Sequence, residues 1–216
     1  MKREPKIFLL TIISLIILCA AFQAQAQENT GKVAVVNDTV ISQQQFDREM
    51  IPVQEVIDAS GKSLSATDMA TVKKTVLEKI IKNELLYQEC LKNNVEISET
   101  DINKKFESVK SQFASDAEFQ QRLTELNSNE ELYKSQLKKE LAIQRLINQK
   151  FKPTITDKEI KAYYDANPDK FKEASFDDAT KADIRKTIGK EKIADSYNNF
   201  YAGVREKAKV DIFLKE

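Results

Sequence analysis

Chemistry in this chain would have to rest on carboxylates or on a thiol, because the sequence contains no histidine. Histidine is the common general base, the usual metal ligand and the usual activator of a nucleophile. The adjacent acids Glu130-Glu131 and Asp177-Asp178 could in principle supply the carboxylate pair of a glycosidase. Adjacent acids at expected helix starts are equally explained by capping and by the helix dipole. We therefore expect no enzymatic activity, no cofactor and no bound metal.

The thiol candidate is Cys90, which lies in a segment with helical apolar periodicity, Leu86 to Leu91. We expect it to be a small buried hydrophobic residue, since no histidine is available to activate it. A reactive thiol is the alternative. Cys90 is the only cysteine after residue 26, so we expect no internal disulfide.

The N-terminus has the pattern of an export signal. Lys2, Arg3 and Lys6 precede an almost unbroken apolar stretch from 7 to 22, and a small-x-small motif ends at Ala26. This pattern predicts a signal peptide over residues 1–26 that is cleaved after Ala26. An uncleaved signal that anchors the protein in a membrane is the alternative.

The charge balance argues against a nucleic-acid partner. Removal of residues 1–26 takes the 34 basic and 34 acidic residues of the chain to 31 and 33, a net charge of −2. Both signs are interleaved, as on a solvated surface, and a chain with four glycines shows no glycine-rich phosphate loop. We expect no binding to DNA or RNA.

Most of the chain should be helical, because four glycines and four prolines are too few for a fold with many tight turns. Ser or Thr followed three residues later by Asp, Glu or Gln is typical of a helix start. Six such signals precede apolar periodicity, and they predict helices that begin after Ser42, Ser65, Ser98, Ser115, Ser128 and Thr156.

Two segments follow a strand pattern instead. Residues 33–41 read as a β-hairpin with Asn37-Asp38 at its turn, and residues 210–214 alternate like a strand. An isolated hairpin is marginally stable in water. We therefore expect the last strand to pair with the hairpin, which requires a long helix from about Asp177 to Lys209 to return the chain to the same structural unit.

Five segments together carry a resemblance to a known family. They resemble the N-terminal chaperone region of the SurA family, which comprises periplasmic parvulin-linked chaperones related to PrsA and PpiD. The segments are Lys32–Ser42, Glu78–Asn94, Phe119–Phe151, Ile155–Phe171 and Tyr201–Ile212. The resemblance implies a mainly α fold, a SurA/trigger-factor-like helical chaperone module whose small N-terminal hairpin is joined by the C-terminal strand.

The resemblance also implies a domain organisation. Residues 27–171 would form the N-terminal helical region, and residues 179–216 would supply the helix and strand that complete the same domain. The family carries a parvulin prolyl isomerase domain at the position where this chain has only residues 172–178. Without histidine the active-site motif of that domain is absent, so we expect no isomerase activity.

The family resemblance implies an ATP-independent periplasmic holdase that binds unfolded polypeptides, above all precursors of outer-membrane proteins. Adaptable apolar side chains on the less repetitive helices are candidate contacts, although ordinary core packing is the commoner role of such residues. These candidates are Met50, Phe106, Phe113, Phe119 and Tyr133. The alternatives are a scaffold for one folded envelope protein and a membrane-tethered chaperone with an uncleaved signal. A homodimer interface would have the same composition as a client surface.

Overall fold

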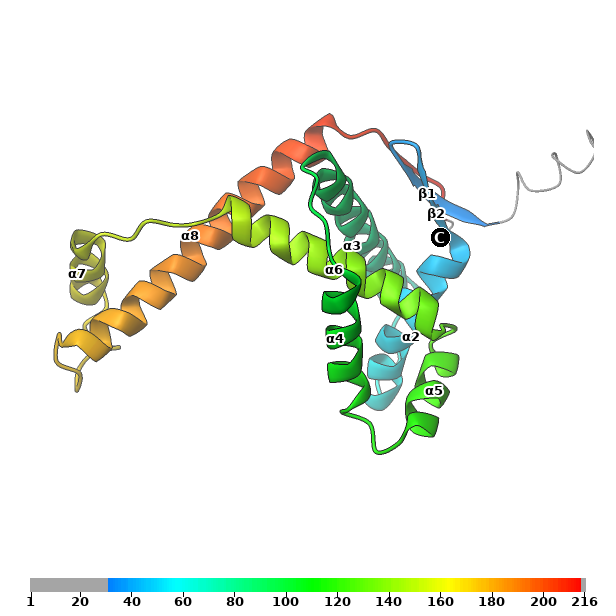
Figure 1. The fold of residues 1–216 in the computed structure, drawn as a ribbon, viewed down its shortest axis with the longest axis horizontal. Coiled ribbons are helices and arrows are strands. Elements are labelled where there is room, and N and C mark those ends of the chain that lie inside the picture. The colour runs from blue at the N-terminus through cyan, green and yellow to red at the C-terminus, as the bar shows by residue number, and fades with distance from the viewer. Residues whose placement is uncertain (1–30, 215–216) are drawn as a thin grey trace, which may run out of the picture.

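The computed structural model describes residues 31–214, so the expected signal peptide, residues 1–26, lies outside the described residues. The mainly helical fold with a small sheet is confirmed (Figure 1). The elements are β1 (Lys32–Val36), β2 (Thr39–Ser42), α2 (Gln43–Ala59), α3 (Ala66–Lys92), α4 (Glu99–Lys110), α5 (Asp116–Glu125), α6 (Glu130–Lys150), α7 (Asp157–Ala166), α8 (Asp178–Lys207) and β3 (Val210–Ile212). None of the helices in residues 31–214 has an apolar stretch long enough to span a bilayer.

The sheet joins the two ends of the described chain. Its strand order is β2-β1-β3 with antiparallel neighbours, and Val36 lies opposite both Thr39 and Val210. The predicted return of the C-terminal strand is therefore confirmed. The strand ends at Ile212, but the Phe213 N–H still donates to the Val33 carbonyl at 2.8 Å.

Side-chain caps start the helices as the sequence pattern predicts, with one exception. Ser42, Ser65, Ser98, Ser115 and Thr156 each accept a hydrogen bond from the amide three residues later. The predicted cap at Ser128 is wrong by one residue, because Asn129 Oδ1 accepts from the Leu132 N–H at 2.9 Å. The Ser128 N–H instead donates to the Leu123 carbonyl at 2.8 Å and closes the end of α5.

Helix α3 connects two cores. Its middle, from Val76 to Leu85, packs against the buried face of the sheet and against Phe46 of α2. Its C-terminal end contributes Cys90 to a second core with α4 and α6. Cys90 is fully buried, as predicted, and burial raises the pKa of its thiol to about 11.

Helix α7 and the first half of α8 form an arm that extends away from the sheet (Figure 1). Its core consists of Ile160, Ile184 and Ile188 with the aromatic side chains of Tyr163, Tyr164, Phe171 and Phe176. The segment before α8 is tied to this arm, because the Tyr164 hydroxyl donates to the Ala174 carbonyl at 2.8 Å. The second half of α8 returns to α3 and leads into β3.

Candidate functional site

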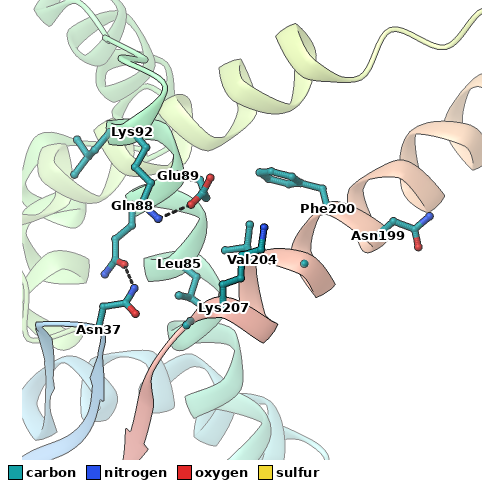
Figure 2. Close-up of a pocket in the computed structure, with 12 residues that line it drawn as sticks. Asn37, Leu85, Gln88, Glu89, Lys92, Asn199, Phe200, Val204 and Lys207 are labelled. Atoms are coloured by element: carbon teal, nitrogen blue, oxygen red, sulfur yellow. Dashed lines mark hydrogen bonds and ion pairs between the residues drawn. The ribbon is translucent and has the colours of Figure 1, made fainter.

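An open cleft of about 620 Å³ lies between α3 and the second half of α8 (Figure 2). Its two helical walls come from parts of the chain that are far apart in sequence, and the hairpin turn lies at one end. The residues that line the cleft include Asn37 from the turn, Leu85, Gln88, Glu89, Leu91 and Lys92 from α3, and Phe200, Gly203, Val204 and Lys207 from α8.

The cleft has apolar surface on both walls. Leu91 on α3 is 57% exposed, and Val204 and Phe200 on the facing helix are half-buried. At Gly203 an added Cβ would meet no atom within 4 Å. The space beside α8 is therefore open at this point and can admit a side chain from another molecule.

Side-chain amide groups form hydrogen bonds that fix the hairpin turn against α3 at the end of the cleft next to the sheet. Asn37 Nδ2 donates to Gln88 Oε1 at 2.6 Å, and Gln88 Nε2 donates to the Val36 carbonyl at 3.2 Å. Asn37 Oδ1 accepts from the Lys209 N–H at 3.0 Å. Asn37 adopts a positive φ of 54°, which asparagine tolerates better than most residues. One side chain thus links the hairpin, α3 and the start of β3.

The charges at the rim are few, and the two lysines among them are exposed. Lys92 Nζ lies 2.7 Å from Glu89 Oε1 one helical turn away, and Lys207 lines the facing wall. A pair whose lysine is this exposed contributes about 1 kcal/mol or less to stability. In the part of the chain that the structure describes, no three side chains of metal-binding type are gathered. The geometry is suited to weak, adaptable contact with apolar side chains and peptide groups.

Four of the five residues predicted from sequence lie together, but away from this cleft. Phe106 of α4, Phe119 of α5, Tyr133 of α6 and Phe113 form an aromatic cluster, in which the rings of Phe106 and Phe119 are 5.4 Å apart between centroids. Phe119 also lies 5.2 Å from Phe113 and 6.2 Å from Tyr133. Burial raises the pKa of the Tyr133 hydroxyl.

The aromatic cluster is closed in this conformation. Phe106 and Phe119 are each 2% exposed, so neither offers a surface to a client unless α5 moves. Met50 lies apart from the cluster and packs, partly buried, against the core beneath the sheet. The structure thus places these residues mainly in packing roles.

Sequence reasoning missed the residues of the cleft, although one of them carried a signal. A glycine in a helix interior costs about 1 kcal/mol relative to alanine, so Gly203 within a long apolar stripe was an anomaly. Leu91 gave no such signal, because an aliphatic residue near the end of a helix is ordinary.

Three comparisons place the chain among known proteins. Residues 2–147 match the model of a family described as SurA-like N-terminal domain. The chain is 25% identical over 181 residues to the foldase protein PrsA of Caldanaerobacter subterraneus subsp. tengcongensis, an alignment that covers 79% of this chain and 54% of that protein. The chain therefore spans about half the length of that relative.

A solved structure shares the fold. It covers 86% of this chain and 100% of its own, with a TM-score of 0.55 and 10% identity. It comes from Campylobacter jejuni, where the virulence factor PEB4 and the periplasmic protein Cj1289 are described as two structurally related SurA-like chaperones. The family model covers well over half of the chain, so the predicted relationship is confirmed: the protein belongs to the family of SurA-like N-terminal domains.

Proposed function

We propose that this protein is an ATP-independent holdase of the periplasm, which binds unfolded polypeptides in the cleft between α3 and α8. Membership of the SurA-like family supports a chaperone role. The observation that carries the proposal is the open cleft of about 620 Å³, whose walls combine exposed aliphatic surface with amide groups.

Unfolded polypeptides present what such a cleft can bind. An extended chain exposes apolar side chains and unpaired peptide groups, and folding buries both. Leu91 and Val204 offer apolar contact, while Gln88 and Asn37 supply polar groups at the end of the cleft. Binding of this kind needs no nucleotide. Precursors of outer-membrane β-barrels are the clients we propose, since their strands alternate apolar and polar residues.

The aromatic cluster of Phe106, Phe113, Phe119 and Tyr133 is a second contact in this proposal. A client reaches it only when α5 separates from α4 and α6, because Phe106 and Phe119 are buried. The exposed ion pair between Arg122 of α5 and Glu55 of α2, with N–O distances of 2.6 and 2.7 Å, would have to break in that movement. The cleft therefore makes the first contact.

We also propose that the chain has no prolyl isomerase activity. The sequence contains no histidine, and the family's isomerase chemistry depends on a domain that the segment 172–178 is too short to contain. The PrsA relative is called a foldase, and this chain spans 54% of it. A proline-containing test peptide should isomerise at the same rate with and without the protein.

The holdase function is tested by light scattering. An unfolded outer-membrane β-barrel protein is diluted from urea with and without a near-equimolar amount of the chain from Gln27 onward, which contains every residue that the structure describes. Reduced scattering in the absence of nucleotide is the expected result. A folded preparation, verified by circular dichroism, that leaves the scattering unchanged would overturn the proposal.

A further inference from the structure

A second cavity, of about 120 Å³, lies between α2 and the start of α6 and is lined by an arginine that has an unused donor. Arg48 lines this cavity with Ser128, Tyr133 and Gln136. The Nε of Arg48 is buried and has no hydrogen-bond partner, and it is the only buried side-chain nitrogen or oxygen in residues 31–214 in that condition. Native proteins rarely leave such a group unpaired.

Other donors line the cavity beside Arg48. Burial raises the pKa of the Tyr133 hydroxyl, so this group keeps its proton and can donate at any physiological pH. Gln136 adds an amide to the same wall. The one acid that lines the cavity, Glu49, has its Oε2 at 3.0 Å from Lys79 Nζ, and none of the oxygens of Glu49, Ser128 and Gln136 accepts a hydrogen bond from Arg48 Nε. The missing partner is therefore an acceptor.

A carboxylate fits this requirement in both size and chemistry. The volume is several times the roughly 30 Å³ that a water molecule occupies in the liquid. Arginine is the side chain best suited to bind a carboxylate, through parallel N–H donors. We propose that the cavity binds a carboxylate of a client polypeptide through Arg48, with Tyr133 as a second donor.

The surroundings of the cavity favour a polypeptide over a free anion. A groove of about 320 Å³ between α2 and α6 shares Glu49 and Gln136 with the cavity. The half-buried Ile143 and Ile147 line it together with Glu84, Lys139 and Glu140. An extended segment that lay over these isoleucines would reach Arg48 with its next charged group. This proposal rests on the proposed function, since both require the protein to bind extended chains.

Binding of labelled peptides tests the assignment. Three decapeptides share one sequence of alternating apolar and neutral polar residues: the first ends in a free carboxylate, the second in an amide, and the third in an amide with one internal Asn replaced by Asp. Fluorescence anisotropy gives the affinity of each for the wild-type protein and for Arg48→Gln. Arg185→Gln is the matched control, since Arg185 pairs with Asp157 on the exposed arm, away from the groove.

We expect at least one acidic peptide to bind the wild type roughly tenfold more tightly than the neutral peptide, as a charge-assisted hydrogen bond predicts. Arg48→Gln should abolish this preference, and Arg185→Gln should keep it. The peptide that shows the preference identifies a chain terminus or an acidic side chain as the source of the carboxylate.

Equal affinities of all three peptides for the wild type would overturn the carboxylate site and leave the holdase proposal standing. Failure of every peptide to bind the folded wild type would overturn both proposals. The comparison within the wild type can overturn the carboxylate site even if Arg48→Gln does not fold. A preference that persists in a folded Arg48→Gln would place the carboxylate elsewhere and overturn the assignment.

Discussion

Two substitutions of Gly203 test different properties of the protein: alanine tests the stability of α8, and leucine tests whether clients bind in the cleft. A glycine in a helix interior costs about 0.8–1.0 kcal/mol relative to alanine, and an alanine Cβ at this position meets no atom within 4 Å. Gly203→Ala should therefore raise the free energy of unfolding by nearly the whole amount, about 0.8 kcal/mol. Urea unfolding followed by circular dichroism measures the change.

Gly189 provides a matched control on the same helix. An added Cβ there would lie 3.2 Å from Ile155 Cδ1, so the side chain of Ile155 has to shift before the helix gains from the substitution. Gly189→Ala should stabilise the protein less than Gly203→Ala. A loss of stability in Gly203→Ala would show that the space beside Gly203 is not open, and equal gains at the two positions would show that Ile155 does not hinder a Cβ at Gly189.

Gly203→Leu tests whether the cleft binds clients. Leucine is nearly as good a helix former as alanine, so the protein should remain folded, but its side chain would occupy the cleft between α3 and α8. We expect Gly203→Ala to suppress client aggregation and Gly203→Leu to suppress it markedly less at the same concentration. A folded Gly203→Leu protein that is as effective as the wild type would refute the cleft as the client site.

Three further predictions concern single side chains. The buried thiol of Cys90, with its pKa raised to about 11, should react with a thiol reagent near neutral pH only after unfolding, so prompt reaction of the folded protein would contradict the packing of α3. Asn37→Ala should lower the midpoint of thermal unfolding more than Asn37→Gly. Both variants lose the hydrogen bond to Gln88, but alanine also bears the roughly 1 kcal/mol cost of a positive φ. A lower midpoint for Asn37→Gly than for Asn37→Ala would contradict the turn geometry. Contacts with Lys192 and with the backbone N–H and hydroxyl of Thr156 lower the pKa of Glu159 to about 2 from its ordinary 4.5. The ionised Glu159 carboxylate therefore stabilises α7 fully above about pH 4.5, and this stabilisation is lost as the pH falls towards 2. The protection of the α7 amides from hydrogen exchange should decrease over this pH range, and it should decrease less in Glu159→Gln.

Local rules predicted the elements of this fold well, because caps and turns depend on neighbouring residues. Ser65 and Thr156 start their helices through contacts only three residues away, and such contacts can be read from the sequence. The error at Ser128 arose where two capping residue types are adjacent. The geometry of the preceding chain decided between them, since Asn127 takes a φ of 48° and directs the Ser128 N–H back to α5.

The cleft could not be predicted in the same way. Its walls depend on how α8 lies against α3, and no local pattern around Leu91 or Gly203 specifies that placement. Side-chain type also fails to distinguish a groove from a core. Phe106 and Phe119 have the composition expected of a client surface, yet packing among α4, α5 and α6 buries them almost completely.

The position of β1 has a consequence for how the protein is made. β1 lies in the centre of the sheet, and Asn37 beside it bonds to Lys209, which is 172 residues later in the chain. A chain that emerges N-terminus first presents β1 with one edge open until nearly all of the described residues have been delivered, and closure of so long a loop is slow. Assembly of the α3–α8 cleft also waits for the second half of α8. During its own biogenesis the protein therefore has neither a closed sheet nor a complete α3–α8 cleft until the last of the described residues have been delivered.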